Sequence, residues 1–244
     1  MINQWQSFLI ALQFLTTIPV HVSDPVKPKN IGYSLLYYPL VGLIIAGIVL
    51  LSIYLLDSQS AWVSAILTLT LWIVLTGGLH LDGLADSADA WLGGLGDKEK
   101  TLRIMKDPAS GPIAVVVLLM VLLIKFIMLA DLIQHQQWLD IIAVLVLARM
   151  ALPLLLLTTP YVRHDGIGAI LINNLPKKHL RIMLAILGLL ALSLISFIPL
   201  LLFLVVLLLL RYYMLKRLDG TTGDTAGAML EVLETTTLIT FVIF

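Results

Sequence analysis

The chain alternates long apolar runs with short polar connections. Four of these runs, at 31–56, 58–79, 112–132 and 139–159, carry at most two charged side chains each. A helix needs about 20 predominantly apolar residues to cross a bilayer. Each run therefore predicts one transmembrane helix.

The apolar run at 182–210 is longer and contains no charged residue. As one helix it would measure about 43 Å, whereas the hydrocarbon core of a bilayer is about 30 Å thick. It is therefore either one tilted span or a hairpin of two spans, with the break near Ser193, Ser196 and Pro199. The apolar residues that follow Glu234 to Phe244 predict the end of a last, short crossing, which begins within the helix that carries the glutamates.

The distribution of basic residues favours the hairpin. Thirteen of the fifteen Lys and Arg residues fall in four segments, at 21–30, 97–106, 163–181 and 211–217. The other connections contain none, at 57–60, 131–138 and 193–199. With a hairpin all four basic segments lie on one side of the membrane, which the positive-inside rule makes the cytoplasm. This orientation predicts active-site loops on the cytoplasmic side of the inner membrane.

The N-terminal residues predict a helix that lies in the membrane interface. Apolar side chains keep helical spacing, while glutamines interrupt the pattern too often for a span: Trp5, Phe8, Leu12 and Leu15 against Gln6 and Gln13. The absence of a basic leading region argues against a signal peptide. The patterns together predict an all-α, multi-pass helical membrane protein. We expect about six to seven transmembrane helices plus the N-terminal interfacial helix, in a single domain over residues 1–244.

Composition supports this class. Hydrophobic residues make up 60% of the chain and charged residues 12%, and the mean hydropathy is +1.03. Soluble proteins carry about 25% charged residues. The formal net charge is zero and the chain has no cysteine. We therefore expect no nucleic-acid partner, no disulfide and no zinc–thiolate site, and the lipid bilayer is the environment.

An acidic stretch interrupts the apolar pattern at 77–111. As a helix it places Asp82, Asp86 and Asp89 within about 60° of one another, in one acidic stripe. Like charges repel unless a cation lies between them, and carboxylate oxygens favour Mg²⁺ first and Mn²⁺ second. The alternative is a solvated polar face without a metal. The opposite side predicts a packing face, comprising Leu81, Leu84, Ala88, Trp91, Leu92 and Leu95.

A second acidic face follows the last basic segment. Helical spacing places Asp224 and Glu231 on one side, two turns apart. Thr222 and Gly223 precede them, where backbone N–H groups and a hydroxyl can contact phosphate oxygens. Two acidic faces on one side of a bundle can hold Mg²⁺ against a diphosphate, as phosphoryl transfer requires.

Several other polar side chains are candidates for this chemistry. Lys106, Arg163 and Arg217 could neutralise phosphate charge, although Lys106 could equally pair with Asp107. His80 could accept a proton from an attacking hydroxyl, or it could be a hydrogen-bonded structural histidine. His164 is a weaker candidate for substrate contact. The intramembrane charges Lys125 and Arg149 are either functional or paired with carboxylates of the bundle.

Four motifs carry a resemblance to a known family. They are Phe14-Leu-Thr-Thr-Ile-Pro-Val20, Gly78-Leu-His-Leu-Asp-Gly-Leu-Ala-Asp-Ser-Ala-Asp-Ala-Trp91, Ile104-Met-Lys-Asp-Pro108 with Gly111, and Gly223-Asp-Thr-Ala-Gly-Ala228 followed by Glu231. In this order they resemble the cobalamin synthase family, the adenosylcobinamide-GDP ribazoletransferases. The resemblance covers essentially the whole chain.

The resemblance implies an inner-membrane transferase that requires Mg²⁺. Its substrates would be adenosylcobinamide-GDP and α-ribazole or α-ribazole 5′-phosphate, and GMP would leave. By position, Asp82, Asp86 and Asp89 would form the metal cluster, with Asp224 and Glu231 as the second acidic arm. The further active-site candidates would be His80, Lys106 and Asp107. The oligomeric state stays open, with a homo-oligomer as one option.

Other classes use similar acidic motifs. CDP-alcohol phosphotransferases and aromatic prenyltransferases share the metal–diphosphate chemistry, but their motifs Asp-Gly-x-x-Ala-Arg and Asn-Asp-x-x-Asp are absent here. A secondary transporter would bind ions at acids near the midplane of the membrane. The acids here cluster in predicted cytoplasmic connections, which favours an enzyme.

Overall fold

A computed structural model describes residues 2–22, 25–163 and 165–244 of the chain. His164, the weaker candidate for substrate contact, lies outside these ranges. The described residues are almost entirely helical, with no strand beyond a single isolated bridge between Tyr161 and Thr221. The predicted all-α class is confirmed.

Five helical stretches are long and apolar enough to cross a bilayer. They are Pro28–Leu55, which joins α2 (Pro28–Ser34), η1 (Leu35–Tyr37) and α3 (Tyr38–Leu55), then α7 (Pro112–Gln134), α8 (Trp138–Thr158), α11 (Phe197–Leu218) and α12 (Gly223–Ile243). A sixth arises if α4 (Ala61–Thr76) and α5 (Leu79–Gly93) form one bent span. The multi-pass helical membrane protein predicted from the apolar runs is confirmed.

The long apolar run at 182–210 is broken into two helices, as its length and the basic residues predict, although only the second, α11, is among the five candidate spans. Helix α10 (Lys177–Leu194) ends just before Ile195, and α11 begins at Phe197 with Ser196 as its N-cap. Ser196 and Pro199 lie at the break. Pro199 falls in the first turn of α11, where a proline is tolerated, whereas it would disrupt the interior of one continuous helix.

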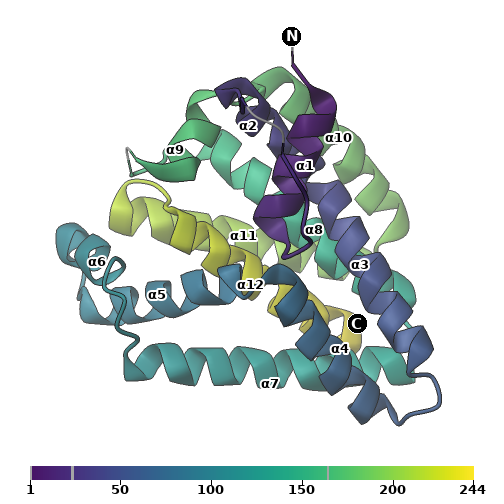
Figure 1. Ribbon diagram of the computed structural model, residues 1–244. Helices are drawn as coiled ribbons and strands as arrows, with labels where there is room; N and C mark the ends of the chain where they lie inside the picture. Colours follow the sequence, from purple (N-terminus) through teal and green to yellow (C-terminus); the bar gives the residue numbers. More distant parts are fainter. Residues whose placement is uncertain (1, 23–24, 164) are drawn as a thin grey trace.

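A sharp bend separates α4 from α5. Gly77 and Gly78 both adopt left-handed backbone conformations, with φ of 65° and 66°, which side chains other than glycine rarely tolerate. The two helix axes consequently meet at 86°. The bend directs α5 along α7 instead of continuing the path of α4 (Figure 1).

Helix α12 runs through the middle of the molecule, where α5, α7, α8 and α11 pack around it (Figure 1). Its N-terminus is fixed by a capping box in which the Thr222 hydroxyl accepts from the Thr225 N–H. The helix continues from Gly223 to Ile243 without a break. The last crossing is therefore longer than the short one predicted, because the acidic residues are accommodated inside the bundle.

Three shorter helices complete the fold: α1 (Gln4–Leu15), α6 (Lys98–Ile104) and α9 (Gly166–Asn173). The predicted N-terminal helix is present as α1, which packs on α2 and α3 and buries Leu12 and Leu15 while Trp5 stays exposed. Helix α9 follows the bridge at Tyr161 and was not predicted, since it has only eight residues.

Candidate active site

Helices α5 and α12 cross at van der Waals contact through glycine. A Cβ added to Gly83 would lie 2.8 Å from the carbonyl oxygen of Asp224, and one added to Gly227 would lie 3.3 Å from the Cα of His80. Small residues let two helix backbones approach this closely. The crossing brings Asp82 of α5 beside Asp224 of α12, so residues from the two predicted acidic faces meet.

The predicted packing face of α5 is only partly confirmed. Leu84 is buried, but Leu92 and Leu95 are 57% and 81% exposed. The other buried residues are small or polar and lie mostly off that face: His80, Gly83, Ala85, Ser87 and Ala90. Close backbone approach to α12 through the small side outweighs the area that the leucines would bury.

A cavity of about 420 Å³ lies beside this crossing. Its polar wall gathers candidates from four separate segments, namely His80, Asp82, Lys106, Arg163 and Asp224. Its other wall is apolar or aromatic, formed by Phe14, Tyr38, Leu152, Leu156, Ile167 and Leu171. A cavity of this size, with a few convergent polar groups on an apolar lining, is typical of a small-molecule site.

The bridge between Pro160–Val162 and Thr221 places the cationic wall of the cavity. The Val162 N–H donates to the Thr221 carbonyl at 2.9 Å, and the Thr221 N–H donates to the Pro160 carbonyl at 2.8 Å. Arg163 follows directly, and its guanidinium donates to the Asp224 carboxylate at 2.6 Å. The predicted substrate-binding arginine and the predicted acidic residue therefore form a half-buried pair at the cavity.

The carboxylates of Asp82 and Asp86 have no ion-pair or hydrogen-bond partner among the described residues. Their charges nonetheless lie close enough to that of Asp224 to interact. In the described part of the chain no three His, Asp or Glu side chains converge into a ready metal cage. Mg²⁺ does not need one, because it is commonly held by one or two carboxylates together with substrate phosphates and water. The donor set at Asp82, Asp86 and Asp224 therefore fits Mg²⁺ chemically.

Asp89, the third member of the predicted metal stripe, has structural partners instead. Its carboxylate accepts from the backbone N–H groups of Gly111 and Ala114, the second at 3.0 Å. Gly111 is the N-cap of α7 and, as a glycine, has no side chain that could cap the helix itself. Asp89 therefore caps α7 from a different helix, and a Cβ at Gly111 would lie 2.7 Å from its carboxylate.

Glu231 is also placed differently from the predicted metal role. It lies inside the bundle, where its carboxylate accepts from the Lys125 ammonium at 2.6 Å. Glu234, one turn further along α12, pairs with both Lys125 and Arg149. Two basic and two acidic side chains thus form a buried, neutral cluster. The intramembrane cations Lys125 and Arg149 are therefore paired with carboxylates of the bundle.

Three further predicted residues, Thr222, Arg217 and Asp107, do not line the cavity. Thr222 is fully buried as the cap of α12, while Gly223 beside it lines the cavity. Arg217 donates to the carbonyl of Trp91 and lies 5.6 Å from that ring. Asp107 is exposed and accepts from the Ala109 N–H at 3.0 Å, leaving Lys106 free to face the cavity.

Two features of His80 suit a chemical role. The side chain is only 4% exposed, and it lines the cavity next to Asp82. Its Nδ1 has no hydrogen-bond partner within the described residues. A buried polar atom without a partner costs free energy, so a ligand that occupies the cavity could supply one.

The comparisons with known proteins cover nearly the whole chain. The model of the cobalamin-5-phosphate synthase family matches residues 7–242. The chain belongs to this family. Curated relatives named adenosylcobinamide-GDP ribazoletransferase include one from Pseudomonas putida W619, 51% identical over 95% of this chain and 96% of the relative. Another, from Stutzerimonas stutzeri, is 50% identical over 95% of both chains. No solved structure matches the chain.

Membership of the cobalamin-5-phosphate synthase family makes the protein a transferase and confirms the resemblance read from the four motifs. Three of these motifs supply cavity residues, since Phe14, Asp82 and Asp224 come from different ones. The fourth supplies Lys106 and, through Gly111, a backbone N–H that donates to the Asp89 carboxylate.

Tyr161 is a cavity residue that the sequence did not reveal. It lies beside Gly223, and a Cβ added to that glycine would be 3.7 Å from the tyrosine hydroxyl. Burial raises the pKa of Tyr161, so its hydroxyl remains a hydrogen-bond donor at neutral pH. No motif marks this residue, because its place depends on the bridge to Thr221 sixty residues later in the chain.

Asp89→Ala is expected to destabilise the protein by about 1–2 kcal/mol, because two N–H groups at the start of α7 lose their acceptor. Thermal unfolding in detergent measures the loss. The Mg²⁺ concentration that gives half-maximal transferase activity should stay unchanged. A large increase in that concentration would instead indicate that Asp89 binds the metal.

Gly83→Ala is expected to lower stability by about 1–3 kcal/mol, because the added methyl group forces α5 away from the Asp224 backbone. Gly188→Ala is the matched control, since a Cβ there meets nothing within 4 Å. That exchange should be neutral or stabilising by up to about 1 kcal/mol, as alanine favours a helix. Equal unfolding temperatures for the two variants would contradict the close crossing.

Proposed function

We propose that this protein is an adenosylcobinamide-GDP ribazoletransferase, which joins adenosylcobinamide-GDP to α-ribazole or its 5′-phosphate and releases GMP. The observation that carries the proposal is the cavity between α5 and α12, in which acidic, basic and apolar walls meet. The names of the relatives and the family match support the same activity.

The polar wall receives the diphosphate. Arg163 and Lys106 supply positive charge to the phosphate oxygens, and Gly223 leaves the start of α12 open to them. Helix N-termini favour anions through their free N–H groups and their dipole. Asp82, Asp86 and Asp224 would hold Mg²⁺, which when bound neutralises the charge that develops on the leaving phosphate.

His80 acts as the proton acceptor in this proposal. A ribazole hydroxyl attacks the phosphorus attached to the cobinamide arm, a new P–O bond forms, and the bond to GMP breaks. GMP leaves with the electron pair, and the hydroxyl proton passes to the imidazole. Burial favours the neutral imidazole, which has one ring nitrogen free to accept this proton.

The apolar wall suits the other substrate. α-Ribazole is a benzimidazole nucleoside, so one end is a flat aromatic base and the other a sugar with hydroxyl groups. Phe14 and Tyr38 stack with their ring centroids 6.1 Å apart, and both line the cavity together with the charged residues. Base burial on this side would orient the sugar hydroxyls toward His80 and Asp82. The corrin ring would remain outside, with only its phosphate-bearing arm entering.

The same proposal places the cavity on the cytoplasmic side of the inner membrane. Lys106 and Arg163 belong to two of the four basic segments, which the positive-inside rule assigns to the cytoplasm. Labelling of single cysteines introduced at 106 and at 57 in intact cells tests this orientation. Because the chain has no native cysteine, a membrane-impermeant reagent should modify only the residue at 57.

GMP release tests the activity. Detergent-purified protein with adenosylcobinamide-GDP, α-ribazole and Mg²⁺ should release GMP and form the joined product. Release should stop without ribazole and after removal of the metal with EDTA, and added Mg²⁺ should restore it. Failure of folded protein to release GMP would favour another diphosphate transferase, and activity in EDTA would reject the metal.

A further inference from the structure

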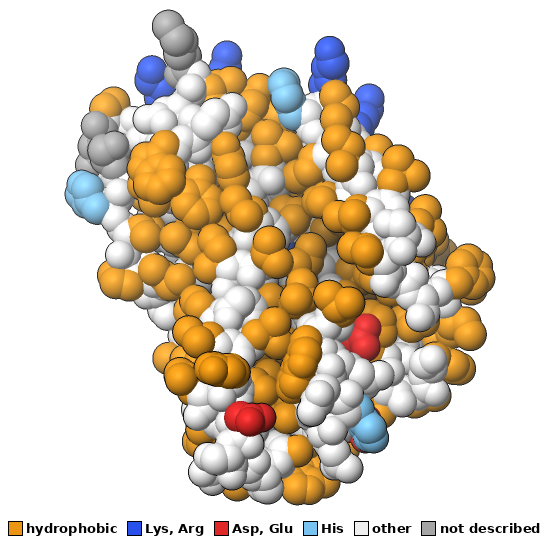
Figure 2. Space-filling view, turned by 90° about the vertical axis from the view of Figure 1, so that its right-hand side faces the viewer, with side chains coloured by type: hydrophobic (Ala, Val, Ile, Leu, Met, Phe, Trp, Pro, Cys, Tyr) orange, Lys and Arg blue, Asp and Glu red, His pale blue; other side chains and the backbone are white. Residues whose placement is uncertain are grey.

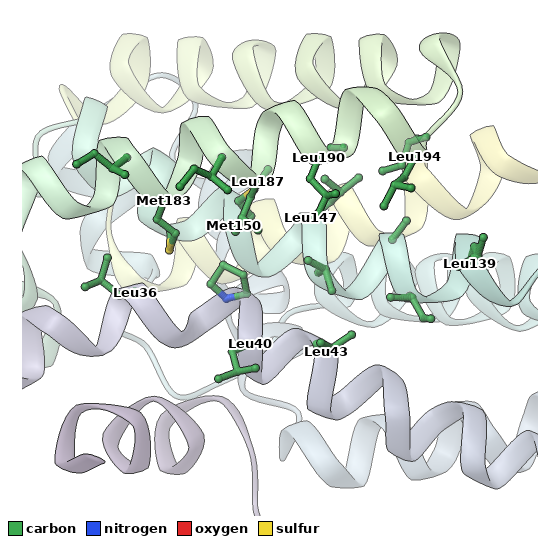
Figure 3. A pocket seen from close by; sticks show the side chains of 18 of the residues that line it. Leu36, Leu40, Leu43, Leu139, Leu147, Met150, Met183, Leu187, Leu190 and Leu194 are labelled. Carbon is green, nitrogen blue, oxygen red and sulfur yellow. The ribbon is translucent and has the colours of Figure 1, made fainter. Parts of the chain in front are cut away.

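A second and larger cavity lies away from the active site, between α3, α8 and α10. It measures about 740 Å³, and its lining is almost entirely aliphatic, with His179 and Asp140 as the only charged or titratable members. Figure 3 shows leucine and methionine side chains of the three helices projecting into the space between them.

The groove exists because α10 is held away from the bundle. Only Leu180 and Ala191 of this helix are buried. The residues that face the groove recur at helical spacing over the whole of α10: His179, Ile182, Met183, Ile186, Leu187, Leu190, Ala191 and Leu194. An apolar stripe four turns long thus lines the groove and is only partly covered by protein, which indicates a long, apolar occupant.

The charges at the groove are asymmetric. Lys177, Lys178 and Arg181 do not line the groove, but they are exposed at the start of α10 beside His179, which does, and none has an ion-pair partner within the described residues. Tyr33 contacts His179, with ring centroids 5.5 Å apart, and links this end to the start of α2. At the other end of the groove stands Asp140. Figure 2 shows this polarity, with Lys and Arg above, acidic side chains below and hydrophobic side chains between.

We propose that this groove binds an anionic phospholipid, with its acyl chains along α10 and its phosphate at Lys177, Lys178 and Arg181. The stripe from His179 to Leu194 extends about 22 Å as a helix, which exceeds the roughly 15 Å of one leaflet. Basic clusters between transmembrane helices on the cytoplasmic side recognise anionic head groups. A zwitterionic lipid would fill the apolar part but would not engage the three cations.

Native mass spectrometry of the full-length protein in detergent tests the proposal. Phosphatidylglycerol should be retained as one tightly held molecule per protein, and phosphatidylcholine about tenfold or more weakly, since each basic residue near an anionic head group contributes roughly fivefold. The triple variant Lys177→Gln, Lys178→Gln, Arg181→Gln should lose this preference. The control Lys100→Gln, Arg103→Gln, Lys216→Gln changes the charge equally elsewhere and should keep it.

Two tryptophan variants of α10 test the groove itself. Leu190 projects into the groove (Figure 3), whereas Leu189 is 68% exposed and does not line it. Leu190→Trp should reduce the retention of both lipids, and Leu189→Trp should leave it unchanged. Equal retention of the two lipids by the wild type, an equal effect of both tryptophans, or a dimer without lipid would each overturn the proposal. None of these readouts depends on transferase activity.

Discussion

Asp82→Asn should lower the rate of GMP release by about 10²–10³-fold, the loss typical for removal of one group that stabilises a transition state. Asp82 is exposed to the cavity, and its carboxylate has no partner among the described residues. The amide keeps the shape of the side chain but removes the charge that would hold Mg²⁺. The unfolding temperature should stay unchanged, so the loss of activity should occur without a loss of stability.

Asp57→Asn is the matched control for this exchange. Asp57 is an exposed aspartate in the connection between α3 and α4, outside the cavity lining. Its exchange should leave both activity and Mg²⁺ dependence unchanged. Full activity in Asp82→Asn would contradict a metal-binding role for Asp82 without affecting the family assignment. Equal losses in both variants would indicate a general effect of charge.

Glu234→Leu should have the largest effect on stability, about 3–5 kcal/mol, because it leaves a buried cation without its partner. Glu234 is fully buried and pairs with both Lys125 and Arg149. A loss of this size should lower the unfolding temperature by about 10 °C for a chain of this length. Scanning fluorimetry of the detergent-solubilised protein measures it.

The double variant Arg149→Met, Glu234→Leu separates a missing partner from a packing defect. It removes one cation and one anion together and leaves Lys125 paired with Glu231 at 2.6 Å. Replacing a buried ion pair with apolar residues of similar size is often neutral or stabilising. The double variant should therefore recover most of the lost stability. A double variant as unstable as Glu234→Leu would contradict the importance of charge pairing in the cluster.

The spans could be predicted from the sequence because length and charge set them directly. The break between α10 and α11 follows from a run too long for one crossing and from basic residues on both of its sides. The bend at Gly77 and Gly78 could not be foreseen in the same way. Two adjacent glycines allow many conformations, and only the packing of α5 against α12 selects this one.

The acidic residues likewise divide into those whose place follows from helical spacing and those whose place depends on the rest of the fold. Helical spacing placed Asp82 and Asp86 in one stripe, and their charges do lie close enough to interact. Spacing could not distinguish them from Asp89 or Glu231, which share the periodicity. Those two carboxylates are distinguished by partners distant in sequence, the start of α7 and Lys125. Periodicity describes one helix at a time and contains no information about such partners.

The central position of α12 has a consequence for how the protein is made. It is synthesised after α5, α7 and α8, yet it provides Asp224 to the cavity and both glutamates to Lys125 and Arg149. Until it enters the membrane, α7 and α8 carry unneutralised cations and α5 lacks its crossing partner. An incomplete chain therefore has neither an assembled site nor a neutral interior, and membrane quality control can recognise it by those unpaired charges.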